Sequence, residues 1–276
     1  MFAEVNGCKL YYEIAGSGRP VLTMHGGPGI GDHQDNKKMF GDFEDLGQFI
    51  YYDMRGNGKS SHHPPETYTH EFFCQDAESL RQHLELGMVA IGGGSYGGIL
   101  ALEYALRYQR NVTRILLRGT AASYELQTAA IENALAKNLD GVDRPLLERL
   151  FYGQMKDDDD FRDHFAKIFP LYSTTYDPSR LKELLAKKVF HSATHNAVFR
   201  HEFPKYDIRE RLHEIKVPVL IMAGRHDWIT PATFAEELAE LLPNAQLEIF
   251  EDSGHMLHRD EPERFKRVIT DFLNQD

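Results

Sequence analysis

The sequence of 276 residues has little cysteine, a deficit of positive charge and no long apolar run. Its only cysteines, Cys8 and Cys74, cannot form a disulfide framework, which favours reduced thiols in a cytoplasmic protein. Lys and Arg number 31 against 42 Asp and Glu, a formal net charge of −11. Such a surface repels nucleic-acid backbones and anionic membranes, so we expect neither as a partner. We also expect no transmembrane helix, which needs roughly 18 to 20 unbroken apolar residues, and no secretory signal.

What is present is a globular composition, 42% hydrophobic and 26% charged, with strand and helix patterns in alternation. Asn6-Gly7 predicts a hairpin between strand-like flanks. Short apolar runs predict strands at 21–24, 48–52, 88–91, 115–117, 217–222 and 247–250. Helical periodicity predicts helices at 69–86 (with Gly87 as its C-cap), 96–108, 231–242 and 262–273. This alternation is typical of an α/β fold with a mostly parallel sheet covered on both faces.

The alternation stops after Ala121, where helical patterns rich in charge follow one another without strands. We therefore predict a helical cap at residues 122–212, inserted into an α/β core formed by residues 1–121 and 213–276. The acidic run 157–160 within it is interpreted as a solvated loop or the start of a helix, because four adjacent carboxylates cannot all face one metal ion.

The motif Gly93-Gly94-Ser95-Tyr96-Gly97 carries the clearest chemical signal. It matches G-x-S-x-G and lies between a predicted strand and a predicted helix, as a nucleophilic serine requires. Glycines are needed there because so sharp a turn leaves no space for Cβ atoms beside the nucleophile. The motif predicts that Ser95 is exposed above the sheet edge as a nucleophile.

The sequence also contains parts of two motifs that bind phosphate groups. Gly92, Gly94 and Gly97 satisfy G-x-G-x-x-G, and Arg118 follows at the end of the next strand, where a residue that binds NADP is expected. An NADP-binding oxidoreductase therefore remains an alternative. Gly58-Lys59-Ser60 matches the end of a P-loop, but Asp53 stands where the first glycine of that motif must be, so a P-loop is excluded.

A serine nucleophile needs a histidine to accept its proton and an acid to orient that histidine. In this class of fold the order is Ser, acid, His, each after a strand. Asp227 follows the strand at 217–222 and His255 follows the strand at 247–250, which predicts the triad Ser95–Asp227–His255. Asp252 is a rival acid, although it shares the histidine's own loop.

A tetrahedral intermediate needs two N–H donors. Tyr96, directly after Ser95, is predicted to supply one, and Gly27 in the loop His25-Gly26-Gly27-Pro28-Gly29 is predicted to supply the other. Pro28 has no N–H to donate. His25 is expected to fix this loop by side-chain hydrogen bonds rather than to act as a base.

The H-G-G-P-G loop, the G-x-S-x-G motif and Asp53-Met54-Arg55-Gly56-Asn57-Gly58-Lys59-Ser60, which matches D-x-R-G-x-G-x-S, together resemble the α/β-hydrolase fold and its proline iminopeptidase branch. The resemblance spans the chain except the weakly patterned insertion. It implies an eight-stranded sheet, a helical cap over the site, no cofactor and the triad named above. It also covers lipases, lactonases and esterases.

One position departs from that branch. Proline iminopeptidases often carry Glu after the triad Asp to bind the substrate's ammonium, whereas this sequence has Trp228. Trp228 and the aromatic residues Phe199 and Phe203 predict an apolar pocket for a small-molecule acyl substrate. The alternative partner for an ammonium is Glu202, with Glu125 and Glu132 as further candidates. We therefore expect hydrolysis of small esters or lactones, with proline iminopeptidase activity as the alternative. No metal is expected, because His191 and His195 have no third ligand.

Overall fold

The computed structural model describes residues 1–275, which form one eight-stranded sheet with the order β1-β2-β4-β3-β5-β6-β7-β8. β1 and β2 pair antiparallel, as do β2 and β4, and the remaining neighbours are parallel. The predicted α/β class and eight-stranded sheet are confirmed. The strands are β1 (Phe2–Val5), β2 (Cys8–Gly16), β3 (Pro20–Met24), β4 (Gln48–Tyr52), β5 (Val89–Gly94), β6 (Val112–Arg118), β7 (Val219–Gly224) and β8 (Ala245–Phe250).

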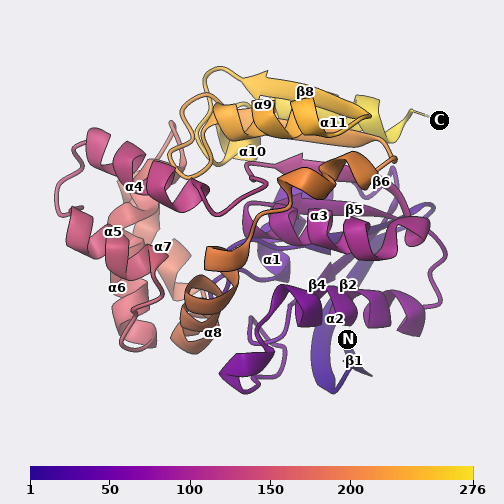
Figure 1. Cartoon of the computed structure of the whole chain (residues 1–276), viewed down its shortest axis with the longest axis horizontal. Helices are drawn as coiled ribbons and strands as arrows, with labels where there is room; N and C mark the ends of the chain where they lie inside the picture. Colours follow the sequence, from indigo (N-terminus) through magenta and orange to yellow (C-terminus); the bar gives the residue numbers. More distant parts are fainter. Residues whose placement is uncertain (276) are drawn as a thin grey trace.

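Helices cover both faces of the sheet (Figure 1). Successive residues of a strand point to opposite faces, so Leu220 and Met222 of β7 join one core cluster and Val219 and Ile221 join the other. The first cluster packs under α1 (His33–Phe40) and α11 (Pro262–Leu273), and the second under α2 (His70–His83), α3 (Tyr96–Tyr108) and α9 (Ala232–Leu241).

Turn residues set several of the points where strands and helices begin and end. Asn6 and Gly7 adopt φ of 48° and 67° and join β1 to β2, which confirms the predicted hairpin. α3 and α11 have the predicted limits. The predicted C-cap at Gly87 is wrong: α2 ends at His83, and Glu85 takes the left-handed conformation with φ 54°.

The chain between β6 and β7 contains the helices α4 (Leu126–Ala136), α5 (Arg144–Phe151), α6 (Asp158–Ile168), α7 (Leu181–Ala186) and α8 (Ser192–Ala197). Figure 1 shows them gathered beyond one end of the sheet, in pink to orange. Asp157 caps α6 by accepting the N–H of Asp160, so the acidic run starts a helix. The segment's two ends meet, because Tyr124 N–H donates to Tyr206 O at 2.8 Å and Ile208 N–H to Ala122 O at 3.0 Å. The predicted cap limits, 122 and 212, lie close to this pairing.

The structure also bears on the two cysteines and on membrane-spanning helices. Cys8 and Cys74 are free and buried. None of the helices formed by residues 1–275 is long and apolar enough to cross a bilayer. A short helix, α10 (Leu257–Asp260), follows the loop after β8 and leads into α11.

Candidate active site

Ser95 lies in the turn between β5 and α3, with φ 56° and ψ −125°. A left-handed φ is costly for any residue with a side chain, so packing must hold it there. A Cβ atom on Gly93 would lie 2.2 Å from the carbonyl oxygen of Gly97, and one on Gly97 would lie 2.0 Å from that of Met24. Both positions therefore require glycine, and the turn holds Ser95 against two cavities.

Asp227 and His255 approach each other from the loops after β7 and β8. His255 Nδ1 lies 2.6 Å from Oδ2 of Asp227, and both side chains are buried. Asp227 also accepts the N–H of Ile229 at 2.9 Å and the hydroxyl of Thr230 at 2.8 Å. Burial raises the pKa of Asp227, but His255 and Thr230 outweigh that effect, so its pKa lies below its ordinary value. The rival, Asp252, is exposed.

Two residues at the end of β6 position this pair. Gly119 has φ 52°, and a Cβ atom there would lie 3.0 Å from the His255 ring and 3.1 Å from Oδ2 of Asp227. Arg118 donates to the carbonyl oxygen of His255 and packs against Gly94. Sequence reasoning missed Gly119 and considered Arg118 only for NADP. The spacing gives no sign of either contact, because each depends on how neighbouring loops meet.

Hydrogen bonds of the backbone and of the His25 side chain hold the loop that carries Gly27. Gly27 has φ 58°, and its carbonyl accepts the N–H groups of Ile30 at 3.0 Å and Gly31 at 2.7 Å. His25 is fully buried; its Nε2 accepts the N–H of Met54 at 3.1 Å, and its Nδ1 lies 3.0 Å from Gly26 O. Burial lowers the pKa of His25, which favours the neutral ring that these bonds need. The predicted loop-fixing role of His25 is confirmed.

Gly27 and Tyr96 line the same cavity as Ser95. Neither backbone N–H donates a hydrogen bond within residues 1–275. The loop 53–60 supports this arrangement: Asn57 Oδ1 accepts the N–H of Gly29 at 2.7 Å, and Asp53 accepts the N–H of Lys59 at 2.8 Å. Two free donors beside a serine form a geometry suited to an oxyanion.

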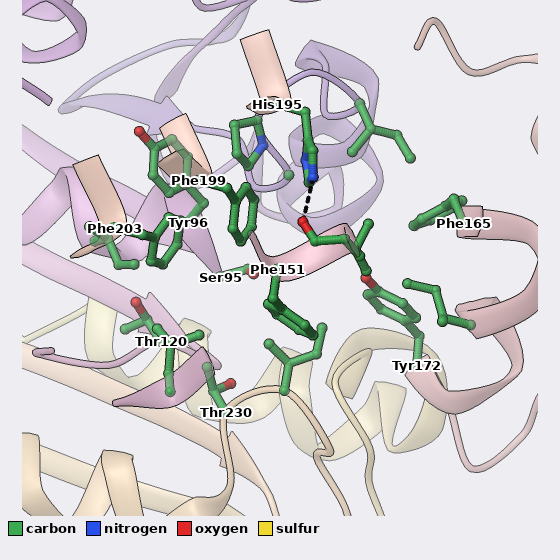
Figure 2. A pocket seen from close by; sticks show the side chains of 18 of the residues that line it. Ser95, Tyr96, Thr120, Phe151, Phe165, Tyr172, His195, Phe199, Phe203 and Thr230 are labelled. Carbon is green, nitrogen blue, oxygen red and sulfur yellow. Dashed lines mark hydrogen bonds between the residues drawn. The ribbon is translucent and has the colours of Figure 1, made fainter. Parts of the chain in front are cut away.

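The first cavity is apolar and has an empty volume of about 650 Å³ (Figure 2). Among the described residues, no Asp, Glu, Lys or Arg lines it. His195 does, but burial lowers its pKa to about 4, so it stays neutral at ordinary pH. The lining residues are Gly27, Pro28, Ile30, Ser95, Tyr96, Ile99, Thr120, Leu126, Leu150, Phe151, Phe161, Phe165, Ile168, Tyr172, His195, Phe199, Phe203, Ile229 and Thr230.

The four residues predicted from sequence as substrate contacts separate into two pairs. Phe199 and Phe203 line the first cavity, with their rings stacked at 4.5 Å between centroids (Figure 2). Trp228 does not line it: the indole is 1% exposed and packs edge-on against Phe151 and Tyr172. Glu202 does not line it either.

Glu202 lies in the helical turn Val198–Glu202, and its carboxylate reaches the start of α2, where it accepts the N–H of His70 at 2.9 Å. The prediction that Trp228 and Glu202 contact substrate in this cavity is therefore not supported. Phe151 and Tyr172, which the sequence interpretation missed, occupy the wall instead. Their placement depends on how the helices between β6 and β7 pack, and no motif marks it.

A second cavity, with an empty volume of about 990 Å³, also borders Ser95 and shares Gly27, Ile30, Phe165 and Tyr172 with the first. His255, Arg118 and Lys188 line the second cavity. No group of three His, Cys, Asp or Glu side chains within the described part of the chain is arranged to hold a metal ion. His195 instead binds the carbonyl oxygen of Leu150 at 2.9 Å.

Comparisons with known proteins bear on the family and the fold of the chain. A family model described as alpha/beta hydrolase fold matches residues 19–262. The chain is 31% identical to "Proline iminopeptidase PfmaB" of Pestalotiopsis fici over 99% of both chains, and 29% identical to a "Proline iminopeptidase" of Clostridioides difficile over 99% of this chain and 97% of the relative. A solved esterase from Exiguobacterium antarcticum superposes with a TM-score of 0.75 at 27% identity, covering 99% of both chains.

Proposed function

The chain belongs to the α/β-hydrolase fold family, and we propose that it is a serine hydrolase that forms an acyl-enzyme on Ser95. The 2.6 Å contact between His255 Nδ1 and Asp227 Oδ2 carries this proposal. It fixes the proton on Nδ1 and leaves Nε2 as the free base of an imidazole that lines the same cavity as Ser95. The family match speaks against the alternative of an NADP-binding oxidoreductase. Arg118, which that alternative assigned to NADP, instead donates a hydrogen bond to the carbonyl oxygen of His255.

The proposed reaction has two halves. His255 Nε2 accepts the proton of Ser95 Oγ as that oxygen attacks the substrate carbonyl, and the N–H groups of Gly27 and Tyr96 hold the resulting oxyanion. His255 then protonates the leaving group. Water, deprotonated by His255, hydrolyses the acyl-enzyme and restores Ser95. Asp227, whose pKa is lowered, stays ionised throughout and stabilises the imidazolium.

For the substrate we propose an uncharged ester or lactone with an apolar acyl group of short to medium length. The first cavity supplies aromatic and aliphatic walls and, within residues 1–275, no carboxylate. A substrate ammonium buried there would lack a counter-charge, at a cost of several kcal/mol. We predict that the substrate is a small acyl compound and that the protein is cytoplasmic.

Proline iminopeptidase activity is the second candidate, supported by the printed names of the two relatives. That activity requires the enzyme to accept a free N-terminal ammonium in the acyl pocket. Glu202, predicted from sequence to bind this ammonium, instead accepts a backbone N–H of α2. The names of the relatives and the lining of the cavity therefore favour different substrates.

A panel of 4-nitrophenyl esters, lactones, proline anilide and N-acetyl-proline anilide separates the candidates. We expect the best ester or lactone to exceed proline anilide in kcat/KM at least tenfold, which is about 1.4 kcal/mol of transition-state binding. The two anilides correct for the greater reactivity of esters, because they differ chiefly in the ammonium. A strong preference for free over acetylated proline anilide would establish the iminopeptidase instead.

A further inference from the structure

The second cavity is lined by positive charge in a protein that is acidic as a whole. Four cations line it, Lys38, Arg118, Lys188 and Arg259, against one carboxylate, that of Asp35. The formal balance is 4 − 1 = +3 within a chain of net charge −11. A concave site of one sign concentrates ligands of the opposite sign.

Two of these cations have no ion-pair partner among the described residues. Asp35 pairs with Lys188. Lys38 and Arg259 form no ion pair within residues 1–275. Burial lowers the pKa of Arg259 and Arg180 lowers it further, while the carboxylates of Asp35 and Asp260 offset part of both effects. An anion bound in the cavity would give Lys38 and Arg259 a partner of opposite charge.

Three buried polar atoms of residues that line the cavity also lack partners. Asn36 Nδ2, Arg118 Nε and His258 Nδ1 have no hydrogen-bond partner in the described part of the chain. The Asn36 side chain belongs to a residue that is only 1% exposed. Each unpaired buried donor costs about 1 to 3 kcal/mol. Asn36 and Arg118 can act only as donors at these atoms, which lie beneath the surface of the cavity, so an acceptor would reach them only if the wall moved.

The position of His255 indicates which part of the substrate, the acyl group or the leaving group, the second cavity would hold. His255 lines the second cavity and not the first. Because His255 delivers the proton to the departing oxygen, the leaving group occupies the side of Ser95 on which His255 lies. The first cavity is then left for the acyl group.

We propose that the second cavity is a leaving-group subsite for a carboxylate, so that the enzyme cleaves esters between an apolar acyl group and a hydroxy acid. This inference rests on the proposed serine-hydrolase function. Ser95 Oγ forms a bond to the acyl carbon, the bond from that carbon to the hydroxy acid's oxygen breaks, and the proton of Ser95 passes through His255 to that oxygen. Water then releases the acyl group as a carboxylic acid.

A matched pair of esters tests the subsite: 3-carboxyphenyl butanoate and its neutral counterpart 3-carbamoylphenyl butanoate. We expect the wild-type kcat/KM to be at least tenfold higher for the carboxylate ester, and the ratio to fall below threefold in Lys188→Gln and in Arg259→Gln. Lys187→Gln is the control, because Lys187 is the exposed neighbour of Lys188 and pairs with Glu183. It should keep the wild-type ratio. Equal kcat/KM for the two esters in the wild type would overturn the proposal.

Binding of the products gives a second readout that does not depend on turnover. We expect calorimetry to show 3-hydroxybenzoate binding at least tenfold more tightly than 3-hydroxybenzamide, with the preference lost in Lys188→Gln and kept in Lys187→Gln. Equal binding would overturn the subsite even if both esters are hydrolysed. Failure to hydrolyse either ester, together with selective binding of the benzoate, would instead overturn the hydrolase function and leave the anion subsite supported.

Discussion

Alanine at Gly119 tests how closely the Asp227–His255 pair must be held. The new Cβ would lie 3.0 Å from Cε1 and Nδ1 of His255 and 3.1 Å from Oδ2 of Asp227. Unstrained contacts of carbon are about 3.5 to 4.0 Å. The imidazole or the carboxylate must therefore move by a few tenths of an ångström, which changes the 2.6 Å contact between them.

Two effects of Gly119→Ala have different sizes and different readouts. The left-handed φ of 52° costs about 1 kcal/mol in the free energy of unfolding. Displacing His255 lowers kcat, and because a misplacement of about 1 Å can cost 10²-fold, a few tenths should cost about tenfold. Gly141→Ala is the matched control: Gly141 has φ 75°, and its Cβ would meet nothing within 4 Å.

The assay compares kcat on 4-nitrophenyl butanoate and the urea midpoint for the wild type and both variants. We expect both variants to lose about 1 kcal/mol through their left-handed backbone, Gly119→Ala to lose more because of its close contacts, and only Gly119→Ala to lose about tenfold in kcat. If Gly119→Ala and Gly141→Ala agree in kcat within twofold, the close packing around His255 has no catalytic consequence and this reasoning is refuted.

The remaining predictions concern the acid of the site and the pH dependence of stability. Asp227→Asn should lower kcat by about 10³- to 10⁴-fold, because the amide favours the wrong imidazole tautomer; Asp252→Asn should change it less than twofold, and the reverse order would show that the acid is misassigned. Burial raises the pKa of Glu78, but hydrogen bonds from Arg81 and Tyr104 outweigh this effect and lower it to about 2, from 4.5. The charged Glu78 therefore stabilises the fold above about pH 4.5, and this contribution is lost as the pH falls toward 2. Urea unfolding from pH 5 to 2.5 should show a smaller loss of stability in Glu78→Gln than in the wild type, and equal losses would contradict the assignment.

Much of the core was predictable because its signals are local. Asn6-Gly7 requires left-handed backbone and forms the hairpin, and glycines at 93 and 97 leave space for the turn at Ser95. The order of Ser95, Asp227 and His255 along the chain follows the order of the strands that precede them. Parallel strands bring their carboxyl ends to one edge, so sequence order becomes spatial proximity.

The walls of the cavities were not predictable in the same way. Trp228 looked like a substrate contact because it follows Asp227, yet it packs behind Phe151 and Tyr172. Glu202 looked like an ammonium partner but binds the backbone of α2. Residues between β6 and β7 take their orientation from helix packing rather than from a turn or a motif, so their sequence periodicity does not say which side chains face the site.

The most direct test of the central claim, that Ser95 is the nucleophile, is mass spectrometry of the protein after treatment with a fluorophosphonate probe. We predict one covalent adduct, located on the peptide that contains Ser95, and no adduct in Ser95→Ala. Asp227→Asn, with Ser95 intact, should react far more slowly than the wild type, because its imidazole is held in the wrong tautomer. A wild-type protein that forms no adduct, or an adduct that persists in Ser95→Ala, would contradict the account.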